Sequence, residues 1–134
     1  MEDSIFTKII NGDIPSFTLY EDEKTIAFLD IHPASKGHTL VVPKVQIDHL
    51  DDLSDADYAA VFTTVKLLTK QLKTAFNPVR VGLVVKGFDV PHAHVHVIPL
   101  YDGESAIPTP PHVDLDAEPD FDALKKIHSE LTSS

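Results

Sequence analysis

The sequence contains no cysteine among its 134 residues. Disulfide bonds and cysteine-ligated zinc sites are therefore excluded, as is usual in the reducing cytoplasm. Long hydrophobic runs are also missing, because the longest apolar stretches, Thr39–Pro43 and Val81–Val85, are far too short to span a membrane. The opening Met-Glu-Asp-Ser does not resemble a secretion signal. We therefore expect a cytoplasmic protein that does not bind membranes.

Basic residues are scarce as well. The chain has 11 Lys and Arg against 21 Asp and Glu, which gives a formal net charge of -10. A nucleic-acid-binding protein normally presents a basic stripe to the phosphates, so we expect no nucleic-acid partner. A small anionic ligand is not excluded, because it responds to the local field of its cleft and not to the total charge.

The local patterns that are present predict one α+β domain. Capping residues and apolar periodicity predict helices at 5–11 and 55–76 and a last short helix through Phe121, Leu124, Ile127 and Leu131. Alternating and β-branched runs predict strands at 17–20, 25–31, 38–42, 79–85 and 92–100. Short links between strands favour an antiparallel sheet. We expect residues 1–101 to form the domain core and residues 102–134 to form a Pro- and acid-rich tail with a short helix, packed on the same single domain.

The segment "PHAHVHVIPL", residues 91–100, places three histidines at every second position. Successive side chains of a strand point to opposite faces. We therefore expect His92, His94 and His96 on one face, while the apolar residues between them face the core. Three clustered imidazoles repel one another once protonated, so a plain solvated face is a poor explanation of this row.

A metal site and a covalent catalyst are the two chemical interpretations of the row. On a strand the Cα atoms of His92 and His96 are about 13–14 Å apart, so one zinc ion does not easily take all three histidines. Two neighbouring triad histidines with His38, His49 or an acid remain an alternative. An imidazole is also a nucleophile towards phosphorus or an acyl carbon, and neighbouring histidines fix its tautomer. Partly protonated histidines favour an anionic substrate.

The row also carries a resemblance. His92-Ala93-His94-Val95-His96-Val97-Ile98 resembles the signature of the histidine triad (HIT) superfamily. "SIFTKIINGDIPS", "AFLDIHPASKGHTLVVPK" and "GFDVPHAHVHVIPL" are similar to the family's segments in the same order, over about residues 4 to 100. The resemblance implies a five-stranded HIT-like fold, a homodimer in which two sheets join, and hydrolysis or transfer of nucleoside monophosphates.

The resemblance also implies roles for individual residues. His94 is expected to be the nucleophile on the α-phosphate, His92 to orient it, and His96 to bind phosphate oxygens on the leaving-group side. Asp30 is expected to hold the ribose hydroxyls, or, from the residues alone, to cap the turn that follows it. The expected nucleotide-binding residues are Ile5, Phe6, Ile9, Phe28, Asp30, Ile31, Lys86, Asp89 and Val90. Ile5, Ile9 and Phe28 are equally compatible with a plain core role. We expect no cofactor.

Two departures from the family pattern stand out. Many relatives carry Cys-x-x-Cys where this chain has Ser4 and Thr7, and a fourth histidine where it has Gln46, and there the cysteines can bind zinc together with histidines. The loop before the triad is short and places Asp89 near the phosphates, where its charge either costs affinity or holds a protonated leaving amine. The sequence thus predicts a HIT-type nucleotide hydrolase or nucleotidyl transferase for a purine nucleotide, of phosphoramidase or dinucleoside polyphosphate hydrolase class. The alternatives are a non-enzymatic nucleotide-binding module and a metal-dependent hydrolase.

Overall fold

The computed structural model of the chain describes residues 2–86, 90–101 and 118–132. Asp89, expected at the nucleotide site, and most of the expected Pro- and acid-rich tail lie outside these residues. None of the helices in the described ranges combines the length and the apolar character that crossing a membrane requires.

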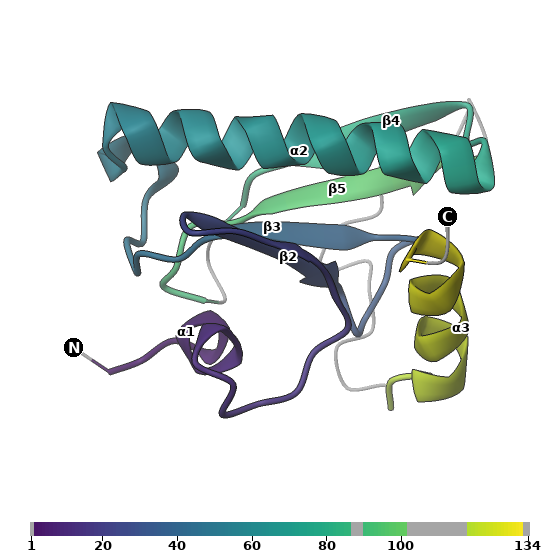
Figure 1. Ribbon diagram of the computed structural model, residues 1–134, viewed down its shortest axis with the longest axis horizontal. Helices are drawn as coiled ribbons and strands as arrows, with labels where there is room; N and C mark the ends of the chain where they lie inside the picture. The colour runs from purple at the N-terminus through teal and green to yellow at the C-terminus, as the bar shows by residue number, and fades with distance from the viewer. Residues whose placement is uncertain (1, 87–89, 102–117, 133–134) are drawn as a thin grey trace.

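In the described residues, an antiparallel sheet of five strands forms the centre of the fold (Figure 1). The strands are β1 (Thr18–Glu21), β2 (Thr25–Leu29), β3 (Thr39–Pro43), β4 (Arg80–Val84) and β5 (Val95–Leu100). Their order across the sheet is β1-β2-β3-β5-β4. The α+β class and the five-stranded antiparallel sheet expected from the sequence are confirmed.

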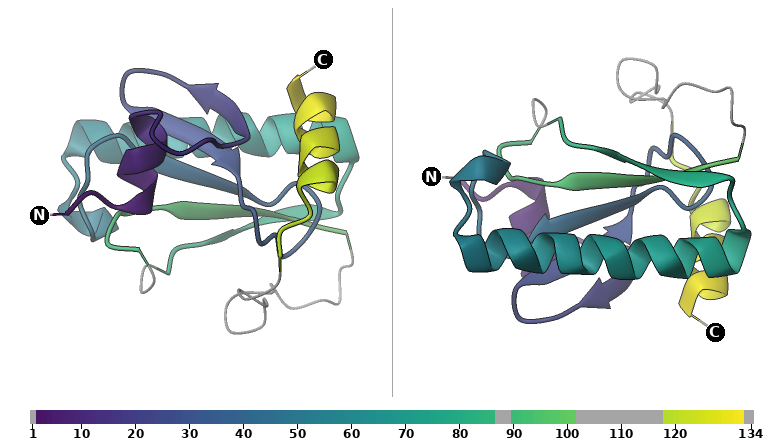
Figure 2. Two further views of the ribbon diagram at one scale, coloured as in Figure 1. Left: turned by 90° about the horizontal axis from the view of Figure 1, so that it is seen from below. Right: turned by 90° about the horizontal axis from the view of Figure 1, so that it is seen from above.

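Three helices of the described residues pack around the sheet. They are α1 (Ile5–Ile10), α2 (Asp55–Phe76) and α3 (Phe121–Thr132), and a short 3-10 turn spans Leu50–Asp52. The long helix α2 crosses one face of the sheet, α1 lies on the opposite face, and α3 stands at one end (Figures 1 and 2). The helices expected at both ends of the chain and the long central helix are therefore present.

Local capping explains why the bounds of α2 match the prediction. The Ser54 side chain accepts a hydrogen bond from the Asp57 N–H and caps the first turn. At the other end Asn77 adopts the left-handed conformation with φ 49°, and its N–H donates to the Lys73 carbonyl. Both signals lie within a few residues of the ends, so the sequence alone contains them.

The central strands β2 and β3 are buried on both faces, because α1 and α2 cover opposite sides of the sheet. Along β2, Ala27 and Leu29 join the core beneath α2, whereas Ile26 and Phe28 join a second core cluster beneath α1. This alternation follows the two-residue period of a strand. The triad histidines belong to the α1 side, since the Phe6 ring of α1 packs edge-on against His94 at a centroid distance of 5.0 Å.

Two of the predicted strand ranges are too long. The strand predicted at 25–31 ends at Leu29, because Asp30 turns the chain by accepting the His32 N–H in its side chain. The strand predicted at 92–100 begins only at Val95. Its partner β3 ends at Pro43, which has no N–H for the ladder. The prediction that all three histidines lie on one strand is therefore wrong, since only His96 does.

The remaining predicted bounds differ from the structure by one residue at one or both ends. The helix predicted at 5–11 ends at Ile10, with Asn11 as its cap. The strands predicted at 17–20, 38–42 and 79–85 run instead over Thr18–Glu21, Thr39–Pro43 and Arg80–Val84. The strands β1 and β2 pair antiparallel, as the short link between them favours.

The two edges of the sheet differ in how they are covered. At the β1 edge, His128 of α3 donates from Nε2 to the Thr18 carbonyl oxygen at 2.7 Å, and Phe121 packs against Phe17. At the β4 edge, the Leu83 side chain is 45% exposed, and Val85 just after the strand is 52% exposed. The β4 edge thus presents apolar side chains to solvent in a single chain.

Candidate active site

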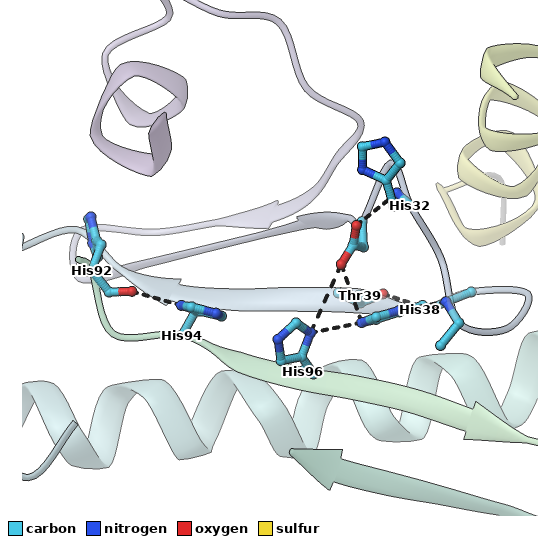
Figure 3. A network of polar contacts seen from close by, with 9 residues as sticks. His32, His38, Thr39, His92, His94 and His96 are labelled. Atoms are coloured by element: carbon cyan, nitrogen blue, oxygen red, sulfur yellow. Dashed lines mark hydrogen bonds and ion pairs between the residues drawn. The ribbon is translucent and has the colours of Figure 1, made fainter. Parts of the chain in front are cut away.

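The three triad histidines line the α1 side of the sheet, although they come from different local structures. His92 and His94 precede β5, where the His92 N–H bonds to the Val90 carbonyl and the Ala93 N–H bonds to the Ile47 carbonyl. His92 is fully buried, and His94 is 6% exposed. Figure 3 shows His94 between His92 and His96. The His94 ring lies edge-on to the His96 ring, and their centroids are 5.1 Å apart.

A backbone carbonyl fixes the tautomer of His94. Its Nδ1 lies 2.7 Å from the His92 carbonyl oxygen, which only accepts hydrogen bonds, so Nδ1 carries the proton of the neutral ring (Figure 3). Nε2 then has a lone pair. Within the described residues, Nε2 of His94 makes no hydrogen bond. If it were also buried, it would be a buried nitrogen without a partner, and the described residues contain no such atom. Nε2 therefore keeps access to solvent, as a nucleophile must.

Both ring nitrogens of His92 are engaged, so this histidine is a fixed support. Nε2 lies 2.7 Å from the Pro43 carbonyl oxygen and must donate to it. Nδ1 lies 2.7 Å from the Ser4 hydroxyl oxygen. The family resemblance implied that His92 orients His94. In the structure, His94 bonds to the His92 backbone carbonyl. The His92 ring anchors that segment of the chain.

His38, which the sequence suggested only as a helper in a metal site, contacts His96 directly. The Ala34 N–H donates to His38 Nδ1 at 2.9 Å, so the neutral ring carries its proton on Nε2. That Nε2–H donates to His96 Nδ1 at 2.9 Å. His96 Nδ1 is therefore an acceptor, and the proton of a neutral His96 lies on Nε2. His38 thus makes His96 Nε2 a hydrogen-bond donor.

The Asp30 carboxylate completes this group. One oxygen accepts the His32 N–H at 2.8 Å, which is the turn-capping contact that the residues alone suggested. The other lies 3.5 Å from His38 Nε2 and 4.0 Å from His96 Nδ1 (Figure 3). The carboxylate is 18% exposed, so part of it remains accessible to a ligand.

Asp30, His38 and His96 also lie close enough to suggest a metal site, with one ligand atom of each within 4.8 Å of the others. The hydrogen bonds argue against this use. A metal ion needs the lone pair of His38 Nε2, but that nitrogen holds the ring proton because Nδ1 already accepts the Ala34 N–H. This donor set does not fit a metal ion without breaking the turn at Ala34.

Burial sets the charges of these groups. Desolvation, with a smaller contribution from His96, lowers the pKa of His38 from 6.5 to about 3. Desolvation also lowers the pKa of His92, although the hydrogen bond to Pro43 opposes the shift. The pKa of the Asp30 carboxyl is raised by its burial, against the effect of the His32 N–H. At neutral pH, His38 and His92 are therefore uncharged supports.

The apolar residues expected to bind the nucleoside fall into two groups. Phe6 and Phe28 are buried with ring centroids 5.7 Å apart, and Ile9 and Val90 pack against the same core cluster. Ile5 and Ile31 are 48% and 39% exposed. The interpretation of Ile5 as plain core is therefore wrong, whereas Phe28 is a core residue. Lys86 is exposed after β4.

Four residues of the site region were missed in the assignment of site residues. His38 gave a weak signal, since it is a histidine at the start of a predicted strand. Ser4, Thr7 and Gln46 were noted only as departures from the family pattern, yet they bond to one another and to His92. A search for polar residues at the positions where the family pattern has cysteine or histidine would have found all three.

Comparisons with known proteins agree on one family. The model of the HIT domain matches residues 11–103. An uncharacterised HIT-like protein of Methanocaldococcus jannaschii is 44% identical over 107 residues, which cover 77% of this chain and 83% of that protein. An adenosine 5'-monophosphoramidase of Saccharomyces cerevisiae is 38% identical over 129 residues, which cover 95% of this chain and 79% of the yeast protein.

The fold is found in solved structures as well. The crystal structure of a HIT-like protein from Bartonella henselae has a TM-score of 0.84 and 29% sequence identity. The likeness covers 98% of this chain and 95% of that one. The five-stranded sheet with its helices is therefore the fold of a known group of proteins.

Proposed function

The chain belongs to the HIT family, and on that premise we propose that it is a nucleotide hydrolase or nucleotidyl transferase. Its substrate is a nucleoside phosphoramidate or dinucleoside polyphosphate, and the reaction occurs at the α-phosphate. One observation carries the proposal: the bond from His94 Nδ1 to the His92 carbonyl directs the lone pair of His94 Nε2 towards solvent beside His96. The yeast relative named as an adenosine 5'-monophosphoramidase favours a phosphoramidate.

In the first step His94 Nε2 attacks the α-phosphorus. A bond forms from Nε2 to phosphorus, and the bond from phosphorus to the leaving nitrogen breaks in line with it. The imidazole becomes cationic, and its Nδ1–H remains bonded to the His92 carbonyl, which stabilises the positive charge. The leaving amine takes its proton from the His96 side, where His38 has placed the ring proton on Nε2.

In the second step a water molecule attacks the same phosphorus. The bond from His94 to phosphorus breaks, a nucleoside monophosphate leaves, and the water proton returns to the group that protonated the amine. Each step is an in-line displacement, so the phosphorus keeps its configuration overall. A nucleophilic alcohol in place of water gives nucleotidyl transfer by the same route.

The remaining expected contacts belong to this proposal. Asp30 binds the ribose hydroxyls through its accessible carboxylate oxygen, as a carboxylate does in dinucleotide-binding folds. The apolar surround of the purine consists of Ile5, Phe6, Ile9, Phe28, Ile31 and Val90. Lys86 and Asp89 act near the phosphates. Exposed Ile5 and Ile31 are the members of this set most able to touch a base.

We also propose that two chains join through the β4 edges. Native proteins protect exposed sheet edges, and α3 contacts the β1 edge, whereas β4 carries exposed Leu83 with Val85 just beyond it. Pairing of two β4 strands covers these side chains. This gives the homodimer that the family resemblance implies.

Hydrolysis of adenosine 5'-monophosphoramidate tests the proposed activity. The wild-type protein should release AMP and ammonia, and His94→Ala should lower kcat by a factor of about 10⁴ or more, as for other covalent nucleophiles. His49→Ala is the matched control, because His49 is exposed and its side chain forms no cap. That control should retain full activity.

The outcomes separate the rival functions. Turnover that survives in His94→Ala, or that a chelator abolishes in the wild type, would contradict covalent catalysis by His94. AMP binding of equal strength in both forms without turnover in either would instead identify a nucleotide-binding module.

A further inference from the structure

A partly buried polar cluster contacts His92 of the triad. Its members are Ser4, which caps α1, Thr7 in the first turn of α1, Gln46 after β3, and His92. Ser4 Oγ lies 2.7 Å from His92 Nδ1, and the Thr7 hydroxyl donates to Gln46 Oε1 at 2.6 Å. Gln46 Oε1 also accepts the Ser4 N–H at 2.8 Å. The cluster therefore joins three segments that are far apart in the sequence.

The shortest hydrogen bonds of the cluster fit a neutral His92. His92 Nε2 must donate to the Pro43 carbonyl, so Nδ1 of the neutral ring is an acceptor and the Ser4 hydroxyl donates to it. Ser4 Oγ accepts the Thr7 N–H at 3.0 Å. Gln46 accepts from Thr7 and Ser4 and donates from Nε2 to the Glu2 carbonyl. Every polar atom thus has its partner, with neutral His92.

These positions correspond to the Cys-x-x-Cys and histidine at which relatives can bind zinc. The residues present here do not fit that ion. Two hydroxyls and a carboxamide oxygen are poor zinc ligands, and both nitrogens of His92 are already bonded. Every buried side-chain nitrogen and oxygen of the described residues has a hydrogen-bond partner, so none of them is an unpaired ligand for a metal ion. Hydrogen bonds hold these positions together in this chain.

We propose that Ser4, Thr7 and Gln46 are positioning residues that hold His92 in place and, through its backbone carbonyl, set the tautomer of His94. The effect of these residues on catalysis rests on the proposed function. Their effect on the tautomers of His92 and His94 does not depend on it. The His92 carbonyl can accept from His94 Nδ1 only while the His92 segment is fixed. Ser4 fixes the ring from one side and Pro43 from the other.

Packing supports the same coupling. Phe6, between Ser4 and Thr7 on α1, contacts both rings edge-on, with centroid distances of 5.8 Å to His92 and 5.0 Å to His94. α1 therefore approaches the histidines through a capping hydroxyl and an aromatic ring together. A shift of α1 moves both contacts at once. Desolvation on burial lowers the pKa of His92 and favours its neutral form.

Paired substitutions test the proposal. Thr7→Val keeps the shape of the side chain and removes the hydroxyl, whereas Thr7→Ser restores the hydroxyl. Ser4→Ala and Ser4→Thr form a second pair with the same logic at the atom that bonds to His92. We expect the hydroxyl-free variants to lose about tenfold in kcat with KM unchanged, and the hydroxyl-bearing variants to recover most of it.

Ser54→Ala is the control for the loss of a helix cap. Ser54 caps α2 as Ser4 caps α1, but it bonds to Asp57 and not to a histidine. We expect Ser54→Ala to lower stability without lowering kcat. Equal kcat values in Ser4→Ala, Ser54→Ala and the wild type, or a loss in Ser4→Ala that Ser4→Thr does not recover, would overturn the proposal. Thr7→Val decides the question if Ser4→Ala does not fold.

A second readout separates this proposal from the proposed function. Proton and nitrogen NMR of the ring N–H groups, without substrate, reports the tautomers of His92 and His94 directly. We expect a protected His94 Nδ1–H and a protected His92 Nε2–H in the wild type, and rapid exchange of both in Ser4→Ala. Unchanged protection in the variant would overturn the positioning role, even if the wild type proved to have no turnover.

Discussion

At the residue scale, His38 shows how the surroundings of an imidazole decide what it does. Its side chain is 3% exposed, its Nδ1 accepts the Ala34 N–H, and its Nε2 donates to His96. Among the described residues, the Asp30 carboxylate lies 3.5 Å from His38 Nε2. His38 therefore acts as a neutral donor that orders His96, and it is not available as an acid or a metal ligand.

His38 should make the stability of the protein depend on pH. Its pKa is about 3 in the folded state against 6.5 for an ordinary histidine. Between these values the unfolded chain binds a proton that the folded chain excludes, so the free energy of unfolding falls as the pH falls below about 6.5. The buried His92 acts in the same direction, whereas the raised pKa of Asp30 acts in the opposite one.

Urea unfolding between pH 7.5 and 4.5 measures this dependence. In His38→Asn the amide oxygen can still accept the Ala34 N–H, but the titrating group is gone. We expect the slope of unfolding free energy against pH to decrease by up to about 1.4 kcal/mol per pH unit, which is the contribution of one proton. Equal slopes in the two proteins would contradict the assignment of a neutral, buried His38.

At the element scale, local signals predict helices well and strand ends poorly. Ser54 and Asn77 lie at the ends of α2, so its bounds follow from the sequence. The start of β5 depends on Pro43 and Ile47, which lie more than 40 residues away from it, so alternation alone extends the strand too far. The face of each histidine was predictable from the two-residue period, but its local structure was not.

The same distinction explains what was missed in the site. The three histidines of the triad are close in sequence and were found. The contacts from His38 to His96 and from Ser4 to His92 join residues 58 and 88 positions apart. A sequence pattern does not predict contacts over such separations. His38 and Ser4 reach the site only through the fold.

The turn before β3 gives a test of how tightly α2 packs on the sheet. Gly37 has φ +90°, and a Cβ atom there would lie 3.0 Å from Leu72 Cδ2 and 3.3 Å from the Phe76 ring. Gly12 has a similar φ of +81° but no heavy atom within 4 Å of a Cβ. At both glycines a substituted residue would have a strained backbone conformation. Only at Gly37 would the new side chain also meet neighbouring atoms.

We expect Gly12→Ala to lower the free energy of unfolding by about 1–2 kcal/mol, from the left-handed conformation alone. Gly37→Ala should cost about 1–3 kcal/mol more, because the new methyl group meets α2. Urea unfolding of the two variants beside the wild type measures the difference. Equal losses would mean that the contact between Gly37 and α2 is looser than described.

At the scale of the whole molecule, the open β4 edge predicts the assembly state. The proposed dimer buries Leu83, whose side chain is 45% exposed in the single chain. We expect light scattering to give twice the mass of one chain for the wild type, and the mass of one chain for Leu83→Asp. A carboxylate at a paired edge is costly to bury, which is the physical reason for this expectation.

Val45→Asp is the matched control, since Val45 is also apolar and 40% exposed but lies outside β4. It should remain a dimer. A dimer that persists in Leu83→Asp and dissociates in Val45→Asp would place the interface elsewhere.

The covalent bond from His94 Nε2 to phosphorus can be detected by the mass of the intact protein. Wild type and His94→Ala are mixed with an adenosine phosphoramidate and quenched in acid-free denaturant within a single turnover, because a phosphohistidine-type bond is labile in acid. We predict an added mass of one adenylyl group in the wild type alone. Rapid release of AMP without any adduct at any time, or an adduct of equal yield in His94→Ala, would contradict the account.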